Sequence, residues 1–288
     1  MRRRPAVVNA DPSMETPLLE QDARSAPVPS RQTALVPLGN AFNLRAFLLR
    51  LLSWWLRCWS GLHAWIPGQP ALTPTQADRL KALRVEAAEM YSVSDPAHQQ
   101  ALQELWELAF PSHPYQGVRS AMWKDMGWQG EDPGTDFRGA GFLGLHCLLY
   151  LGRRHPLVFD ALLHKRAGSR AEWEYPFAVA GLNLSYVLAD LLELQQAQGP
   201  RSRLLPDLEA APHSAAARAF VQLLGQDEDA FEEVYVVAFE LLDGQWLAMG
   251  ASYMQFNQVL KETRAGICKA LCSRPRDIKQ LRQRVFCQ

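Results

Sequence analysis

The sequence predicts an all-α protein, with a single compact multi-helix domain preceded by a disordered arm and an amphipathic helix. Apolar residues recur at helical spacing from about residue 75 nearly to the C-terminus, which is the primary signal for helices. The only strand-like run, 234–237, is surrounded by Glu232, Glu233, Phe239 and Glu240, which suit a helix better. No repeat of 20 to 50 residues interrupts this pattern, so a solenoid is not indicated.

The composition is that of an ordinary globular protein. Of 288 residues, 48% are hydrophobic and 21% are charged, which is enough apolar material for a sizeable core. Thirty basic residues balance thirty acidic ones, so no global field favours nucleic acid, and we expect no nucleic-acid partner. The five cysteines are dispersed and lack metal-ligand spacing, and no secretory signal is recognised, so we expect reduced thiols in a cytoplasmic protein.

The first segments differ sharply in character. Residues 1–40 are rich in Pro, Ser and Ala without apolar periodicity, which predicts a disordered arm. Residues 41–66 predict an amphipathic helix, because Arg50 and Arg57 share a narrow polar face and the rest is Leu, Phe and Trp. Three interpretations stay open. A transmembrane span would bury both arginines, at roughly 2.5–3.5 kcal/mol each. An interfacial helix would rest on lipid, and a third helix would pack on the domain. The candidate membrane-contact residues are Arg50, Trp54, Trp55, Arg57 and Trp59.

A linker at 67–74, rich in proline, precedes the predicted domain at 75–272. Asp95 followed by Pro96 predicts a helix start, since Asp caps helices and Pro fits the first turn. The last residues, 273–288, are basic and predict a solvated tail or face. Apolar spacing predicts helices over about 80–91, 96–109, 142–151, 156–163, 176–195, 214–224, 228–242 and 252–271.

The stretch DPGTDFRGAGFLG, residues 132–144, contains the spacing G-x-G-x-x-G of dinucleotide-binding loops, and Asp160 lies where such a motif places its ribose acid. Such a loop needs a buried strand before the first glycine. Here residues 130–138 hold three acids and a proline, which is turn chemistry. We therefore reject the dinucleotide interpretation and expect no cofactor. Gly141 and Gly144, three residues apart, instead predict close helix packing.

Arg138 follows this polar turn, and we expect it in the first turn of a helix capped by Thr135 or Asp136. A helix N-terminus disfavours a cation, so the position is anomalous. From spacing alone, the plainest explanation is a salt bridge to Asp132 or Asp136. His146 and Cys147 follow on the same helix, where we expect a buried core pair and no metal site.

The residues around this stretch resemble the signature of the ELMO (engulfment and cell motility) domain, closest to the ELMO-domain-only branch. The resemblance covers roughly residues 75–272, including a second block at 175–183. Trp128 and Ala140 depart mildly from the family pattern. The residues that carry the first block are Trp123, Gly127, Trp128, Gln129, Asp132, Pro133, Thr135, Asp136, Phe137, Arg138, Gly139 and Gly141.

This resemblance implies an all-helical activator of small GTPases of the Arf and Arf-like class, with a role in membrane traffic. It implies that Arg138 is an arginine finger that enters the partner's GTP site, while the GTP and Mg²⁺ belong to the partner. The other residues of the block are expected to support the turn. A non-catalytic adaptor that binds a GTPase or a membrane partner through the same surface is the alternative. We expect a cytoplasmic protein, with 41–66 as a candidate for peripheral attachment to an internal membrane.

Overall fold

The computed structural model describes residues 71–165, 174–195, 208 and 210–287. The predicted arm at 1–40, the amphipathic helix at 41–66 and most of the linker lie outside the described residues. The membrane-contact candidates there, Arg50 to Trp59, therefore remain predictions. Within the described part of the chain, no helix combines the length and the apolar character needed to cross a membrane.

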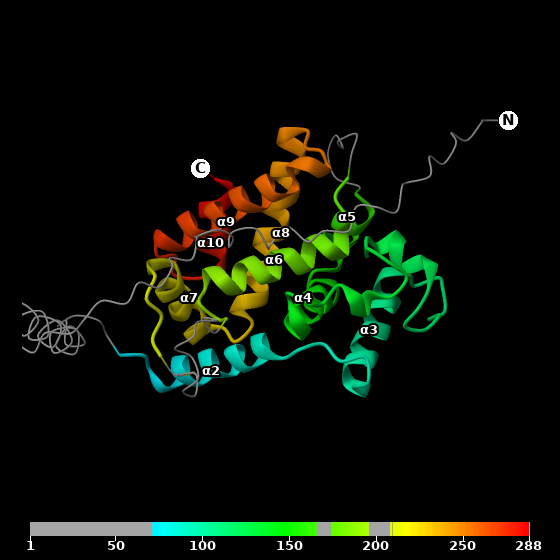
Figure 1. Ribbon diagram of the computed structural model, residues 1–288. Coiled ribbons are helices and arrows are strands. Elements are labelled where there is room, and N and C mark those ends of the chain that lie inside the picture. The colour runs from blue at the N-terminus through cyan, green and yellow to red at the C-terminus, as the bar shows by residue number, and fades with distance from the viewer. Residues whose placement is uncertain (1–70, 166–173, 196–207, 209, 288) are drawn as a thin grey trace, which may run out of the picture. The chain divides into compact units, whose positions relative to one another are not determined.

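The described residues form α-helices and short 3₁₀ helices, with no strand, so the predicted all-α class is confirmed (Figure 1). The run 234–237 lies inside a helix, as expected. The α-helices are α2 (Pro74–Ala88), α3 (Pro96–Ala109), α4 (Gly141–Arg154), α5 (Pro156–His164), α6 (Phe177–Leu191), α7 (Ala215–Gln226), α8 (Ala230–Met249), α9 (Phe256–Cys272) and α10 (Ile278–Phe286). The 3₁₀ helices are η2 (Ala121–Met126), η3 (Pro133–Thr135) and η4 (Tyr253–Gln255).

Local sequence explains where several helices begin. Asp95 caps α3 as predicted, since its carboxylate accepts the N–H of Ala97 at 2.8 Å and Pro96 is the first helical residue. Thr73 and Gln76 form a reciprocal capping box at the start of α2. These side chains satisfy backbone N–H groups that have no partner inside the helix.

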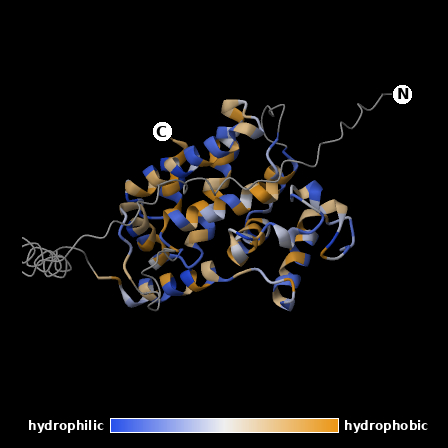
Figure 2. Cartoon of the chain, viewed as in Figure 1, coloured by the Kyte–Doolittle hydropathy of each residue, from blue (hydrophilic) through white to orange (hydrophobic). Residues whose placement is uncertain are grey.

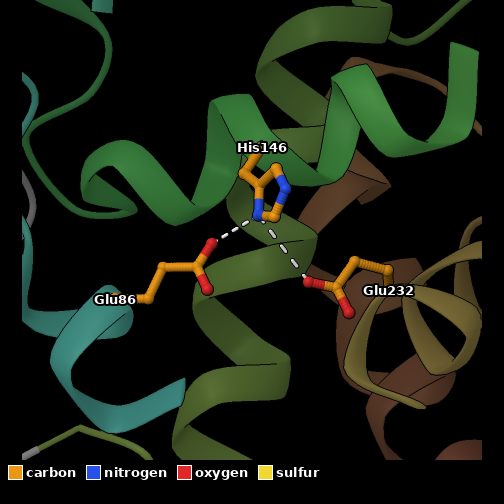
Figure 3. Close-up of side chains that lie close together, drawn as sticks. All are labelled: Glu86, His146 and Glu232. Carbon is orange, nitrogen blue, oxygen red and sulfur yellow. Dashed lines mark hydrogen bonds and ion pairs between the residues drawn. The ribbon is translucent and has the colours of Figure 1, made fainter. Parts of the chain in front are cut away.

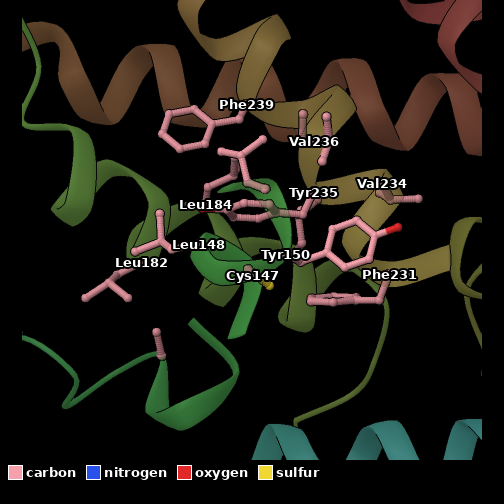
Figure 4. Close-up of a cluster of buried hydrophobic side chains, with 14 of the residues drawn as sticks. Cys147, Leu148, Tyr150, Leu182, Leu184, Phe231, Val234, Tyr235, Val236 and Phe239 are labelled. Carbon is pink, nitrogen blue, oxygen red and sulfur yellow. The ribbon is translucent and has the colours of Figure 1, made fainter. Parts of the chain in front are cut away.

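Helix α4 lies at the centre of the packing and touches α2, α3, α5, α6 and α8. The interior is formed by buried residues of α4, α6 and α8, among them Leu148, Leu184 and Phe239 (Figure 4). Gly144 permits the close approach of α4 to α6, because a Cβ there would lie 2.6 Å from a methyl group of Leu182. The predicted packing role of Gly144 is therefore confirmed.

The C-terminal residues correct one expectation. The segment predicted to be a basic tail contains α10, which packs on α8 and α9. Leu281 is fully buried there, and Arg282 forms an ion pair with Glu240 on α8. The sequence pattern does not predict this helix, because its apolar stripe is narrow and most of its residues are polar or basic. The outer helices α2 and α9 likewise alternate hydrophilic and hydrophobic residues along their length (Figure 2).

Candidate functional site: an arginine on an aromatic-backed turn

Residues 110–140 join α3 to α4 and consist mainly of turns around η2 and η3. Two acids of this stretch bind its own backbone. Asp132 caps η3 by accepting the N–H of Gly134 at 3.0 Å, and Asp136 accepts the N–H of Gln129 at 2.9 Å. The hydroxyl of Thr135 donates to the carbonyl of Asp132 at 2.9 Å. These bonds tie the two ends of the turn together without help from a neighbouring element.

Arg138 is exposed and makes no hydrogen bond or ion pair with any described residue. The expected salt bridge to Asp132 or Asp136 is therefore wrong. Asp132 pairs with Arg119 instead, at 3.3 Å, and Asp136 is bound to Gln129 and Thr135. Because both acids are bound within the turn, the guanidinium of Arg138 has no ion-pair partner among the described residues.

The expected position of Arg138 within the helix is also corrected. Helix α4 begins at Gly141, after a turn at 136–140, and its cap residue Ala140 offers no side-chain hydrogen bond. Neither Thr135 nor Asp136 caps it. The N–H of Phe142 is satisfied instead by the carbonyl of Glu89, at 2.9 Å, from the chain just after α2. Arg138 therefore precedes the helix and is not in its first turn.

Aromatic side chains fill the space beneath the turn. Trp123, Trp128, Pro133 and Phe137 are buried, as expected for residues that support Arg138. The ring of Phe137 stacks on Tyr91 at 4.2 Å between centroids and contacts Trp128 at 5.2 Å. The residue next to the free arginine is thus anchored in the core, which restricts the backbone that carries Arg138.

Tyr91 and His98 extend this support to the start of α4. The ring of His98 stacks on Phe142 with centroids 4.0 Å apart, and its Nδ1 accepts the N–H of Ser92 at 3.0 Å. Nε2 therefore carries the proton and donates to Glu89 at 3.0 Å. Sequence analysis missed Tyr91, His98 and Glu89, because only the tertiary structure brings them to the turn.

Two glycines of the block are required by close contacts. Gly127 has φ +91°, and a Cβ there would lie 2.4 Å from the backbone nitrogen of Phe177. This contact joins the first block of the sequence signature to the second. Gly141 has φ +57°, and its Cβ would lie 2.4 Å from the carbonyl oxygen of Glu89. Gly139 has no such constraint, since its Cβ would make ordinary contact, at 3.8 Å, with the ring of Tyr186.

Exposed apolar side chains lie beside the two glycines that follow Arg138. Tyr186 of α6, beside Gly139, is 45% exposed, and Met90, whose Cα lies near Gly141, is 63% exposed. Gln129 is also exposed, and its side chain makes no hydrogen bond within the described residues. An open cation bordered by apolar groups is typical of a surface that meets another macromolecule. The turn is preceded by no strand in the described residues, so the glycine spacing has no dinucleotide loop around it.

A second polar cluster lies within the helical packing. His146 is half-buried, which corrects the expectation of a buried core pair, and it binds Glu86 of α2 and faces Glu232 of α8 at 3.7 Å (Figure 3). The hydrogen bond to Glu86 raises the pKa of His146, and burial raises the pKa of Glu232 to about 7. Cys147 is buried as expected, and burial raises the pKa of its thiol, so it is not a reactive nucleophile. Sequence analysis missed both carboxylates because they lie far away along the chain.

The fold and the turn define a class: an all-helical domain that presents one unpaired arginine from a hydrogen-bonded turn backed by aromatic side chains. Residues 81–260 match the ELMO/CED-12 family model, and the chain belongs to that family. ELMO domain-containing protein C of Dictyostelium discoideum is 30% identical over 214 residues, 74% of this chain and 33% of that protein. ELMO domain-containing protein 1 of Mus musculus is 37% identical over 119 residues, 36% of each chain. The matched region therefore spans about a third of the length of each of these two relatives.

Proposed function

We propose that this protein is a GTPase-activating protein for small GTPases of the Arf and Arf-like class, and that Arg138 is its arginine finger. The observation that carries the proposal is that Arg138 is exposed and unpaired among the described residues, whereas both nearby acids are bound to the turn. Membership of the ELMO/CED-12 family supports the same reading.

The chemistry requires only an arginine that is held in place. As GTP hydrolysis proceeds, negative charge spreads over the oxygens of the transferred phosphoryl group. A guanidinium from a second protein stabilises this charge and accelerates hydrolysis by roughly 10³–10⁵-fold. The partner GTPase supplies the Mg²⁺, the phosphate loop and the residue that orients the water. In this chain Phe137 anchors the adjacent backbone in the core, so that binding to the partner would have to order only the side chain of Arg138.

Single-turnover hydrolysis of GTP by a panel of Arf and Arf-like GTPases tests the proposal. We expect stimulation to rise with the concentration of the full chain and to fall to the unstimulated rate for Arg138→Ala. Arg138→Lys should restore little, since an ammonium group lacks the planar fork. Arg264→Ala is the matched control, because that exposed arginine of α9 pairs with Asp190 and lies outside the turn.

The alternative is an adaptor that binds the GTPase without accelerating hydrolysis, and it makes a different prediction. The apolar side chains of Met90 and Tyr186 would serve such a contact without help from Arg138. In that case the full chain binds the GTP-bound partner, but the hydrolysis rate stays flat as its concentration rises. Stimulation that survives Arg138→Ala would instead refute the arginine-finger role.

We further propose that residues 41–66 attach the protein to an internal membrane surface, through Trp54, Trp55, Trp59 and the arginines beside them. Flotation with liposomes compares the full chain with a chain that begins at Thr73. Flotation of the full chain alone would support membrane attachment, whereas equal behaviour of the two chains would refute it.

A further inference from the structure

Glu86, His146 and Glu232 converge from three different helices. They lie on α2, α4 and α8, and their ligand-capable atoms all fall within 4.8 Å of one another. Both carboxylates turn toward the same ring nitrogen. Nδ1 of His146 forms a hydrogen bond with Oε1 of Glu86 and lies 3.7 Å from Oε1 of Glu232 (Figure 3). Sequence separation excludes a local helical pairing of Glu86 or Glu232 with His146.

Two carboxylates and one imidazolium leave one net negative charge in this cluster, which either a proton on Glu232 or a bound cation would remove. Two carboxylates face one imidazole, and the side chain of Glu232 is only 6% exposed. Among the described residues, neither carboxylate forms an ion pair with a lysine or an arginine. Arg153 is near enough to act on His146, but its guanidinium is bound to Glu104. A buried carboxylate is costly unless it is protonated, paired or bound to a metal, and a metal is the one of these that would use all three side chains at once.

We propose that Glu86, His146 and Glu232 bind a divalent transition-metal ion, with Zn²⁺ as the ion that this donor set fits best. One imidazole nitrogen and two carboxylate oxygens are ordinary zinc donors, whereas Mg²⁺ and Ca²⁺ prefer oxygen alone. The ion would neutralise both carboxylates. Three protein ligands leave a fourth position for water, on the side where Glu86 and His146 are 29% and 37% exposed.

The required movements are small. Bonds of about 2.1 Å in a tetrahedral site place ligand atoms roughly 3.4 Å apart. Glu86 therefore has to draw back from Nδ1, and Glu232, at 3.7 Å, has to approach slightly. Both changes are within the reach of a glutamate side chain rotating on a fixed helix. The three backbones already point these side chains at one place.

The ion would clamp α2 to α4 directly behind the turn that carries Arg138. Glu86 lies three residues before Glu89, whose carbonyl accepts the N–H of Phe142 at the start of α4. His146 lies one helical turn after Phe142 on the same helix. An ion that binds the folded state and not the unfolded state would stabilise the domain, so the unfolding temperature would rise as the ion is added.

Titration of the full chain with zinc chloride, after removal of metal by a chelator, tests the site. All proteins in this titration carry Cys272→Ser. This change removes an exposed free thiol that lies one helical turn from Cys268 and could bind zinc by itself. We expect one ion per chain by calorimetry and a saturable rise in the unfolding temperature, both unaffected by millimolar Mg²⁺. Glu86→Gln and His146→Ala should each weaken binding by at least about 10-fold.

His164→Ala is the matched control, because His164 also contacts an acid, Asp160, but on the exposed face of α5. It should leave zinc binding unchanged. Co²⁺ supplies a second measurement, since its visible absorption reports the ligands directly, and the bands should disappear in His146→Ala. Circular dichroism verifies that each variant is folded. Absence of saturable binding, or equal binding by wild type and both ligand variants, would overturn the proposal.

Discussion

The carboxylate of Asp136 accepts the backbone N–H of Gln129 at 2.9 Å, although Arg138 lies only two residues away. Asp132 behaves in the same way, since it caps Gly134 and pairs with Arg119. The acids thus stabilise the shape of the turn and leave Arg138 unneutralised. Under the proposed function, Arg138 could therefore reach a partner's phosphate without first breaking an internal salt bridge.

Asp136→Ala should loosen the turn without unfolding the domain. Loss of one backbone acceptor of this kind costs about 1 kcal/mol, so the free energy of unfolding should fall by that amount in urea. The stimulated rate of GTP hydrolysis should fall by more than the small loss of folded protein explains, because the backbone that carries Arg138 is no longer fixed. Asp136→Asn keeps an acceptor oxygen and should retain most of both.

Asp125→Ala is the control for this variant. Asp125 is exposed on η2 in the same stretch and makes no side-chain hydrogen bond with the described residues. Its loss should change neither stability nor activity. If Asp136→Ala behaves like Asp125→Ala, the hydrogen bond to Gln129 does not hold the turn.

Gly141→Ala should be far more damaging than Gly139→Ala, although both glycines belong to the same motif. At Gly141 the new Cβ would lie 2.4 Å from the carbonyl oxygen of Glu89, at a positive φ of 57°. Positive φ alone costs about 1–3 kcal/mol, and the clash adds to it. At Gly139 the new Cβ would contact only the Tyr186 ring, at 3.8 Å, so the free energy of unfolding should change by no more than about 0.5 kcal/mol. Thermal unfolding of the two variants side by side measures the difference, and similar unfolding temperatures would contradict the close approach at Gly141.

These contacts show what the sequence could and could not predict. The helices that bury an apolar stripe, such as α4 and α8, follow from local periodicity and were predicted. The glycine spacing likewise predicted close packing at Gly144. Helix α10 was not predicted, because its apolar stripe is narrow: Leu281 is its one buried residue, with Ile278 and Val285 partly buried beside it under a basic surface.

The site was predictable only where its chemistry is local. Arg138 stands out in the sequence as a cation after an acidic turn, but spacing alone favoured a salt bridge, which the structure excludes. Which donor an aspartate binds depends on the fold of the turn, and proximity along the chain does not determine it. Likewise, His146 meets Glu86 and Glu232 only through the packing of three helices.

Glu104→Gln should weaken the link between α3 and α4 in a pH-dependent way. The hydrogen bond from Arg153 holds the pKa of Glu104 below its ordinary value. A lowered pKa in the folded state means that the stabilisation is present above the ordinary value, about 4.5, and is lost as the pH falls below it. Both side chains are partly exposed, so solvent screening limits the effect to less than about 1 kcal/mol. Urea unfolding should separate wild type from variant at neutral pH and bring them together in acid. A difference that persists in acid would show that the charge of Glu104 is not responsible.

Phe137→Ala tests whether the buried side of the turn positions its exposed side. Phe137 is 2% exposed, stacks on Tyr91 and contacts Trp128. Truncation of a buried phenylalanine costs about 3–5 kcal/mol, whereas Phe137→Leu keeps much of the volume and should cost less. Phe286→Ala, at a half-exposed site on α10, should have little effect on unfolding.

The informative comparison is made with Phe137→Leu at a temperature where that variant remains folded. Since the aromatic stack is lost but Arg138 is intact, we expect reduced stimulation of GTP hydrolysis without loss of the helical circular dichroism signal. A folded Phe137→Leu variant with full stimulation would mean that Arg138 is ordered by the partner on binding. Stimulation that falls in step with stability in both Phe137 variants would instead reflect unfolding of the whole domain, and not a loosened turn.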